Sequence, residues 1–306
     1  MTLTNHDLVV PLSEVTAADV AQVGAKAATL GALRRAEFPV PRGAVLTTTA
    51  LQRALAAAGL AATASPKQVQ DLRLPRCVAD MLAGTAGNPD GGLLAVRSSG
   101  VDEDLPGASY AGQYDSVLGV AVEDLPDAVG LCWASAFAPH AIGYRVAHGG
   151  GQGPAMAVLV QPMVPAEAAG VAFSADPITG DRDTVVINAV RGLGDRLVGG
   201  AAPGDEWLVH GATATCRAAP EGALDAATAR AVAALARRVE TYFGVPQDIE
   251  WALAGGELVL LAHAAIIARE YAVPAVVATG NATELLHDGQ VVTVDGSAGS
   301  VQVHHH

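Results

Sequence analysis

The feature that most constrains what this chain can fold into is the stretch 94–120, where a short apolar strand runs into an arginine, two serines and a glycine-rich loop. Arg97 stands at the end of that strand, and its planar fork of donors suits a bound anion. Gly112 and Gln113 lie in the loop that follows, where glycine lets the backbone approach a ligand closely. The stretch therefore predicts an anion site; the alternative is a strand that ends in a surface arginine.

A lysine near the N-terminus has a comparable setting. Lys26 follows Gly24 in a segment whose pattern predicts a helix over 16–33. Glycine beside a helix start leaves room for backbone contact with phosphate, and lysine adds a mobile positive charge. The segment lacks the GxxxxGK[ST] spacing of a P-loop. Lys26 is therefore a candidate phosphate ligand or, in the simpler interpretation, a solvated helix residue.

Two acidic residues alternate with apolar ones later in the chain. Asp248 and Glu250 share one face of a predicted strand, and the turn at 254–256 leads into a partner strand over 257–261. Carboxylates in such a place suit Mg²⁺, which takes oxygen ligands together with substrate phosphates. The pattern predicts a magnesium site, with an acidic surface strand as the alternative.

The remaining pattern predicts a mixture of helices and strands. We expect further helices over 48–62, 68–83 with a break near Pro75, 122–146 and 225–243. We expect further strands over 8–12, 44–47, 155–161, 170–173, 185–189 and 206–209. A chain of 306 residues is long enough for two modest domains or for one domain with two lobes.

Charge and cysteine content exclude several classes of protein. The net charge of −13 argues against a nucleic acid as partner. Three cysteines without CxxC spacing predict neither a disulfide framework nor a zinc site. The N-terminus lacks the features of a signal peptide, and no apolar run reaches the roughly 18 residues of a membrane span. We expect a cytoplasmic protein without a membrane partner, and 304–306 could be the remnant of a tag.

The motifs around Lys26, around Arg97 and over 247–251 together resemble the nucleotide-binding domain of the phosphoenolpyruvate synthase / pyruvate phosphate dikinase family, which includes the rifampin phosphotransferases. The resemblance implies an α+β fold of the two-lobed ATP-grasp type, with ATP and Mg²⁺ as cofactors. It implies catalytic and nucleotide-binding roles for Lys26 and Arg97, nucleotide contacts for Gly112 and Gln113, and metal binding by Glu250.

The same resemblance assigns an adenine pocket and a further acid. The strand over 155–161 ends where the family lines the adenine pocket, so Gln161, Met163 and Val164 are the implied base contacts. Asp195 stands where the family has the acid of a Gly-Leu-Gly-Glu segment, and it is the implied second metal ligand beside Glu250.

The C-terminal part resembles a different module of the family. The sequence from His263 to Val277 resembles the mobile phosphohistidine domain, which implies that His263 is the relay histidine at the N-terminus of a helix. We therefore expect an ATP-binding domain over 1–261 and a truncated αβ remnant of the phosphohistidine domain over 262–303, joined by a deletion. Where the family has a glutamine and an arginine, this chain has Ala262 and Ala264.

These resemblances imply a phosphotransferase that passes ATP phosphate through a histidine to pyruvate or to another acceptor such as an antibiotic. The domain that would choose the acceptor has no counterpart here, so a separate subunit would have to supply it. With alanine at 262 and 264 we expect little or no phosphorylation of His263. A non-catalytic ATP-binding or regulatory module, a rifampin phosphotransferase-like fragment and a degenerate protein without nucleotide function remain the alternatives.

Overall fold

The computed structural model describes residues 8–88, 91–101, 116–139, 141–142, 154–198, 204–265, 291–295 and 300–304. The chain divides into two compact units, Met1–Met163 and Val164–His306. Each unit has helices and a sheet of its own, which confirms a mixed α and β fold. Within the described residues, no helix combines the length and the apolar character that crossing a membrane requires.

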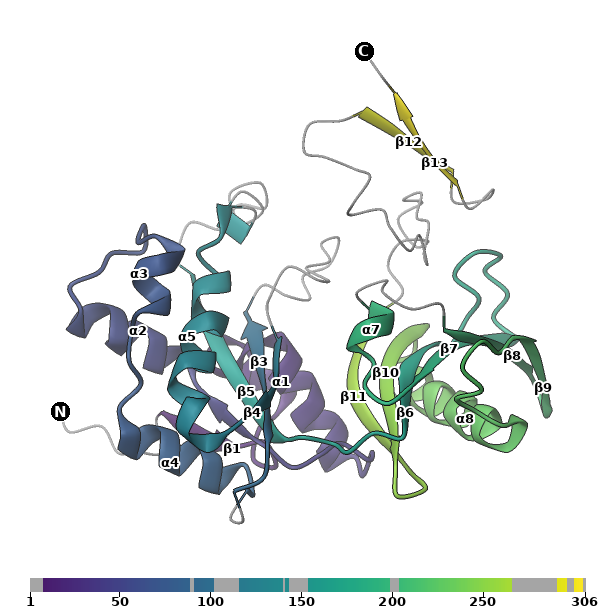
Figure 1. Cartoon of the computed structure of the whole chain (residues 1–306), viewed down its shortest axis with the longest axis horizontal. Helices are drawn as coiled ribbons and strands as arrows, with labels where there is room; N and C mark the ends of the chain where they lie inside the picture. Colours follow the sequence, from purple (N-terminus) through teal and green to yellow (C-terminus); the bar gives the residue numbers. More distant parts are fainter. Residues whose placement is uncertain are drawn as a thin grey trace. The chain divides into compact units, whose positions relative to one another are not determined.

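The first unit is built on a five-stranded antiparallel sheet (Figure 1). Its strands lie in the order β1, β2, β5, β3, β4. Their bounds are Val9–Pro11 for β1, Ala44–Leu46 for β2, Leu94–Gly100 for β3, Ser116–Val120 for β4 and Met156–Pro162 for β5. Strand β3, which carries Arg97, pairs with β5 along its full length and with β4 on its other side, so it is held on both sides.

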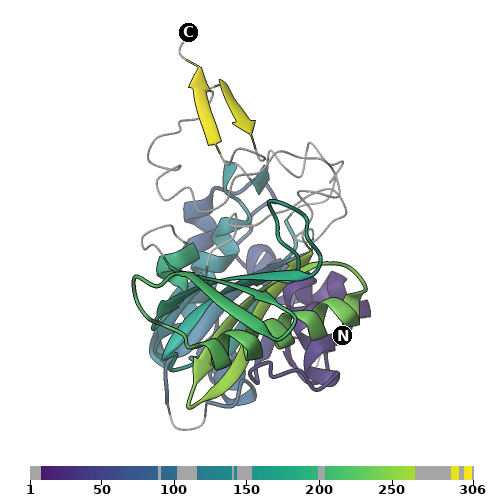
Figure 2. The same ribbon diagram turned by 90° about the vertical axis from the view of Figure 1, so that its right-hand side faces the viewer.

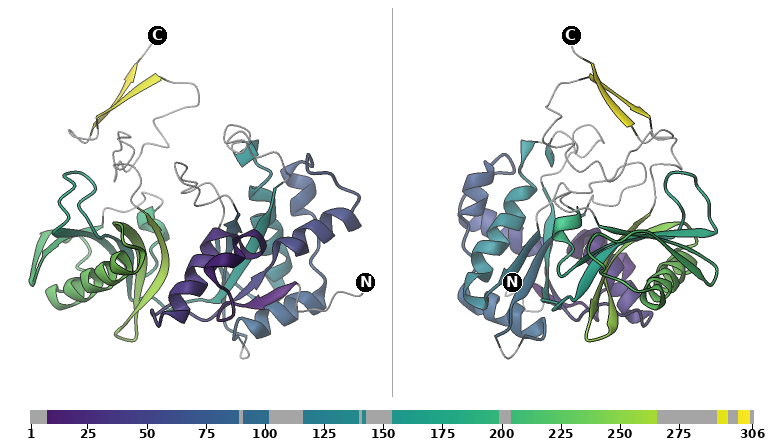
Figure 3. Two further views of the ribbon diagram at one scale, coloured as in Figure 1. Left: turned by 180° about the vertical axis from the view of Figure 1, so that it is seen from behind. Right: turned by 45° about the vertical axis from the view of Figure 1, so that its right-hand side comes forward.

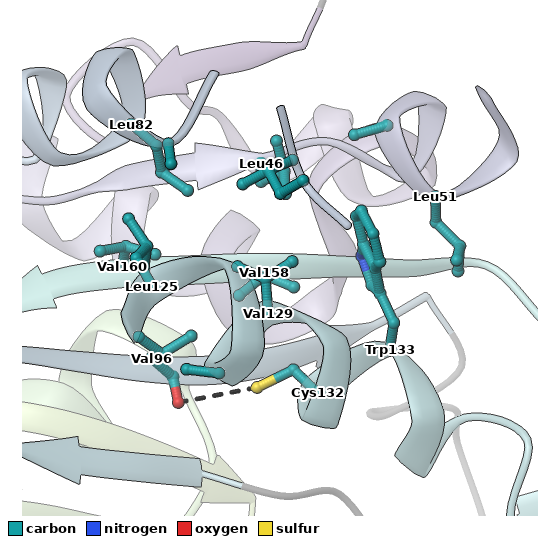
Figure 4. Close-up of a cluster of buried hydrophobic side chains, with 14 of the residues drawn as sticks. Leu46, Leu51, Leu82, Val96, Leu125, Val129, Cys132, Trp133, Val158 and Val160 are labelled. Atoms are coloured by element: carbon teal, nitrogen blue, oxygen red, sulfur yellow. Dashed lines mark hydrogen bonds between the residues drawn. The ribbon is translucent and has the colours of Figure 1, made fainter. Parts of the chain in front are cut away.

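Helices cover both faces of this sheet. They are α1 (Val20–Arg35), α2 (Thr48–Ala57), α3 (Pro66–Gln70), α4 (Arg76–Thr85) and α5 (Leu125–Ser135), with short 3-10 turns at Ala17–Asp19 and Val122–Asp124. Alternate residues of a strand point to opposite faces. Val96 and Val158 therefore face the core that α4 and α5 complete (Figure 4). Leu159 lies on the other face, against which α1 packs.

The second unit is built on a six-stranded antiparallel sheet in the order β11, β10, β6, β7, β8, β9. The bounds are Ala168–Phe173 for β6, Thr184–Arg191 for β7, Asp205–His210 for β8, Thr213–Ala218 for β9, Gln247–Ala254 for β10 and Glu257–Ala265 for β11. The β10–β11 hairpin forms one edge of this sheet (Figure 3). The unit also contains the short helix α7 (Asp195–Val198) and the long helix α8 (Ala226–Phe243).

Helix α8 packs along one face of the six-stranded sheet, as Figures 1 and 2 show. The side chain of Asp225 caps its N-terminus, and Gly244 with φ +76° ends it, as glycine commonly does. Its apolar stripe buries Val232 and Val239, and Ile249 of β10 is fully buried. We call this side of the sheet the helix face. The opposite side, which carries Asp248 and Glu250, is called the carboxylate face.

Most elements expected from the sequence are present with shifted ends. The helix expected over 68–83 is two helices, α3 and α4, because proline cannot continue a helix and the break falls near Pro75 as predicted. The helix expected over 48–62 ends at Ala57. Strand β9 was not expected; its side chains are largely exposed, so it carries little hydrophobic pattern.

One expectation about the C-terminal part is wrong. His263 does not begin a helix: it lies inside β11, which continues to Ala265 because its backbone pairs with β10 as far as Gln247. The boundary expected at residue 261 stays a prediction, and so does the truncated remnant over 262–303. Further along, β12 (Val291–Asp295) and β13 (Ser300–His304) pair as an antiparallel hairpin.

Candidate functional site

In the first unit, the start of α1 lies directly against the end of β3. Gly24 interrupts the helix with φ +74° and ψ 166°. A Cβ at this position would lie 2.0 Å from the backbone oxygen of Ser99, so only glycine fits. The amide of Ala27 donates to the Ser99 hydroxyl at 3.0 Å, and Lys26 Nζ donates to the Ser98 carbonyl at 3.2 Å. These contacts hold the lysine predicted from the sequence at the end of the strand predicted with it.

Arg97 belongs to the same face of the sheet as α1. It pairs with Leu159, and directly opposite residues of neighbouring strands share a face. Ser99, which binds the start of α1, lies two residues further along β3 and so on that face as well. Two cationic side chains, Lys26 and Arg97, therefore come together on one side of the sheet. This is the arrangement that an anionic group such as a phosphate requires.

The three residues expected in an adenine pocket have other contacts. The Gln161 side chain is buried, and its Nε2 donates to the Pro41 carbonyl at 3.1 Å. The Met163 amide donates to the Leu93 carbonyl at 2.9 Å. Val164 is half-buried just beyond β5. Gln161 thus braces the turn before β2, and its role toward a base stays a prediction.

Two carboxylates define the candidate metal site of the second unit. Asp248 pairs with Ala264 and Glu250 pairs with Ala262, so both acids lie on the carboxylate face. The Oδ1 atom of Asp248 is buried and has no hydrogen-bond partner among the described residues. Burial and the nearby Glu250 charge raise the pKa of Asp248 to about 7. A buried carboxyl without a donor is suited to a cation, and hard oxygen ligands suit Mg²⁺.

Asp195 lies on the same side of the sheet but does not complete a larger cluster. It begins α7, directly after Gly194, which packs over Ala169 of β6: a Cβ added at Gly194 would lie 3.4 Å from the Ala169 Cβ. Ala169 pairs with Ala252, two residues beyond Glu250. Among the described residues, however, no three histidine, cysteine, aspartate or glutamate side chains converge to hold a metal ion. A role for Asp195 beside Glu250 stays a prediction.

His263 lies on the opposite side of the sheet from the carboxylates. It pairs with Ile249 and therefore faces α8. Its Nδ1 lies 2.9 Å from Gln247 Oε1, and its ring stacks on Phe243 with centroids 4.5 Å apart. Its Nε2 is buried and has no hydrogen-bond partner in the part of the chain that the structure describes, and burial lowers the pKa of His263 to about 4. The structure therefore separates the expected relay histidine from Glu250.

Some functional candidates fall outside the described residues, and some contacts were not expected. Gly112 and Gln113, and the sequence from Ile266 to Val277, lie outside the described residues. The contacts of Gln247 and Phe243 with His263 were missed, because they depend on strand register and no sequence motif marks them. The packing of Gly24 against Ser99 was also missed, although a glycine just before Lys26 was a usable signal.

Comparison with protein families gives two matches. Residues 75–223 match the AMP/ATP-binding domain of pyruvate phosphate dikinase. Residues 259–299 match the mobile domain of PEP-utilising enzymes. The first match includes β3 with Arg97 and most of the six-stranded sheet, and the second begins inside β11.

Curated relatives match most of the chain. A rifampicin phosphotransferase of a Streptomyces species is 37% identical over 297 residues, covering 80% of this chain and 34% of the relative. A probable phosphoenolpyruvate synthase of Methanothermobacter thermautotrophicus is 28% identical over 424 positions, covering 92% and 61%. The prodigiosin synthesizing transferase PigC of Serratia marcescens is 32% identical over 293 residues, covering 84% and 33%. The chain thus spans a third to three fifths of these relatives.

Proposed function

Because this chain belongs to the family of PEP-utilising enzymes and carries their AMP/ATP-binding domain, we propose that it binds ATP together with Mg²⁺ as the nucleotide-binding part of a phosphotransferase. The observation that carries the magnesium part of the proposal is the Asp248–Glu250 pair. Both carboxylates lie on one face of β10, and Asp248 Oδ1 is buried with no donor among the residues that the structure describes. A divalent cation would remove both the repulsion and the unsatisfied oxygen.

The chain's own residues divide into two groups by chemistry. Lys26 and Arg97 of the first unit would bind phosphate oxygens, with Arg97 offering a planar pair of donors and Lys26 a point charge. Asp248 and Glu250 of the second unit would bind the cation. When bound, Mg²⁺ supplies neutralisation of the charge on the transferring phosphates. The implied second ligand Asp195 and the base contacts Gln161, Met163 and Val164 remain proposals on the strength of the resemblance.

Titration calorimetry of the full chain with ATP, with and without Mg²⁺, tests the proposal. We expect binding that tightens when Mg²⁺ is present and that loses this dependence in Glu250→Gln. Glu206→Gln is a matched control, because Glu206 lies on the same face two strands away from β6 and forms an exposed ion pair with Arg217. If the wild-type chain does not bind ATP, the proposed function is wrong.

A second candidate function is a non-catalytic ATP-binding or regulatory module. Ala262 stands opposite Glu250, where the resemblance implies a polar ligand, and His263 faces α8. Both observations favour a protein that binds nucleotide without completing the relay. ATP binding without hydrolysis or phosphate transfer would support this module.

The acceptor belongs to the proposal only in outline. The relatives are named for phosphoenolpyruvate synthesis and for transfer to rifampicin. Pyruvate or an antibiotic is therefore the acceptor class that we propose, with a separate subunit supplying the acceptor site. Adding pyruvate or rifampicin to the chain alone, with labelled ATP, should yield no labelled product. Labelled product would show that the chain needs no further subunit.

A further inference from the structure

The residues that resemble the phosphohistidine motif form part of the ATP-binding unit's sheet. The match to the mobile domain begins at residue 259, whereas β11 runs over Glu257–Ala265. A register shift between Glu250 and Trp251 divides the hairpin into two parts. Beyond this shift, residues 247–250 pair with residues 262–265. This outer part carries both carboxylates of the candidate metal site, on the strand opposite His263.

The ring of His263 is held by two contacts on the helix face. Nδ1 lies 2.9 Å from Gln247 Oε1, and the ring stacks on Phe243 with an interplanar angle of 19°. Gln247 is itself tied down: its Nε2 donates to the carbonyls of Val245 and Pro246, each at 3.2 Å. Its backbone amide donates to Ser174 Oγ at 2.8 Å. His263 therefore joins the edge strand to a residue that is already fixed to the end of α8 and to β6.

Such a link controls register where register matters. A slip of one residue moves every side chain of a strand to the other face of the sheet. Among the described strands, β11 lies at the edge of its sheet and is held on one side only. The Gln247–His263 contact lies beyond the register shift, in the part that the inner half of the hairpin fixes least. It thus opposes a slip that would change what lies across from Asp248 and Glu250.

The same contacts make both ring nitrogens of His263 inaccessible to a phosphoryl group. One ring nitrogen faces Gln247, and the other, Nε2, is buried. A phosphoryl group brings three acceptor oxygens and a negative charge. On phosphorylated Ser, Thr or Tyr this charge is about −1.5 to −2 at pH 7. Placing that charge beside Phe243 and Ile249, where no described residue hydrogen-bonds to Nε2, would be strongly unfavourable.

We propose that His263 is a positioning residue: it holds Gln247 and, through it, the start of β10, so that Asp248 and Glu250 present their oxygens to one cation. It does not carry phosphate in this chain. The proposal rests on the proposed function, in which those two carboxylates bind Mg²⁺. It assigns a structural use to a motif that resembles a catalytic one.

Two variants of the full chain test the positioning role. His263→Phe keeps a ring to stack on Phe243 but removes the contact to Gln247, and Gln247→Met removes the acceptor at similar length. His210→Phe is the control, because His210 is exposed at the end of β8. The dissociation constant of ATP is measured by calorimetry with and without Mg²⁺, well below the unfolding temperature of each variant.

We expect each variant to weaken ATP binding about tenfold in the presence of Mg²⁺ and to leave metal-free ATP binding unchanged. The double variant should bind Mg-ATP as tightly as the weaker-binding single variant, because both substitutions remove the same contact. An unchanged affinity with Mg²⁺, or an equal loss with and without it, overturns the positioning role. If His263→Phe does not fold, Gln247→Met decides the question by the same two affinities.

Histidine modification of the wild-type chain gives an independent measurement. Diethyl pyrocarbonate followed by peptide mass spectrometry should modify His210 and leave His263 unmodified until the protein is denatured. Incubation with γ- and β-labelled ATP should leave no acid-labile phosphate on His263. Modification of native His263, or labelled phosphate on it, would contradict the claim that its ring nitrogens are inaccessible. If the wild type binds no Mg-ATP, the proposed function and the positioning role both fail, whereas modification still decides whether the ring nitrogens are inaccessible.

Discussion

Ala262 lies directly across the hairpin from Glu250, on the carboxylate face, and its methyl group stands where a longer side chain would meet the Glu250 carboxylate. Neighbouring paired residues have Cβ atoms about 4.5–5.5 Å apart, so an amide at position 262 would reach a cation held by Glu250. The resemblance implies a glutamine here. The position is therefore the simplest place at which to strengthen the proposed metal site.

We predict that Ala262→Gln tightens ATP binding in the presence of Mg²⁺ by about tenfold, which corresponds to about 1.4 kcal/mol. The gain comes from one added oxygen ligand, and hard oxygen is the ligand that Mg²⁺ prefers. Ala262→Met is the matched control, because it adds similar length without an oxygen ligand. Calorimetry with and without Mg²⁺ measures both. Equal gains in the two variants would mean that packing, and not metal binding, causes the effect.

Arg97→Ala should weaken ATP binding. Removing a charge-assisted contact costs roughly 1.5–3 kcal/mol, which is about ten- to a hundredfold in the dissociation constant. Arg76→Ala in α4 is the control, because Arg76 forms an exposed ion pair with Asp80 within the same helix. Exposed pairs of this kind contribute about 0–1 kcal/mol to stability. If Arg97→Ala and the wild type bind ATP with the same affinity, the assignment of Arg97 is wrong.

Gly24→Ala tests the packing of α1 against β3. Both Gly24 and Gly59 have positive φ, +74° and +65°. A Cβ at Gly59 meets nothing within 4 Å, whereas at Gly24 it would overlap the Ser99 backbone. Gly59→Ala should therefore cost only the left-handed strain, about 1–2 kcal/mol, and Gly24→Ala should cost more.

The functional readout separates the two glycine variants further. Only Gly24→Ala displaces the segment that carries Lys26, so only this variant should lose ATP affinity. Denaturant unfolding gives the stability of each variant, and calorimetry gives its affinity. Matching losses of stability in the two variants would contradict the overlap with Ser99.

The placement of the candidate residues was predictable from sequence where it follows from their neighbours in the chain. Lys26 beside Gly24 and Asp248 alternating with Glu250 are local patterns. The structure places the Lys26 amine at the Ser98 carbonyl of β3 and both carboxylates on one face of β10. His263 was predicted in the wrong element because its position depends on backbone pairing with Ile249, fourteen residues earlier in the chain and across a turn. No local pattern reports that register shift.

The same distinction explains the adenine contacts and the missed strand. Gln161 lies near the end of a buried strand, as predicted, but its side-chain amide donates to the carbonyl of Pro41, which is far away in sequence. Strand β9 exposes most of its side chains, so the alternation that marks a half-buried strand is missing. Long-range contacts decided both cases, and a single sequence does not contain them in readable form.

The last prediction concerns the pH dependence of stability. The pKa of His263 is lowered by burial from 6.5 to about 4. As the pH falls below about 6.5, the unfolded chain takes up a proton on this residue before the folded chain does. The stability that neutral His263 contributes is therefore complete above pH 6.5 and is lost as the pH falls through about 4. The loss should be on the order of 2–3 kcal/mol.

Asp248 changes the free energy of unfolding with pH in the opposite direction, so the measurement must cancel its contribution. Its pKa is raised to about 7, so the folded chain takes up that proton first as the pH falls, which favours folding between about pH 7 and its ordinary value of 3.8. Wild type and His263→Phe both contain Asp248, so its contribution cancels in the difference between their free energies of unfolding. That difference, measured by urea unfolding from pH 4 to pH 8, should shift in favour of His263→Phe as the pH is lowered. A difference that stays constant over this range would show that His263 is not buried in its neutral form.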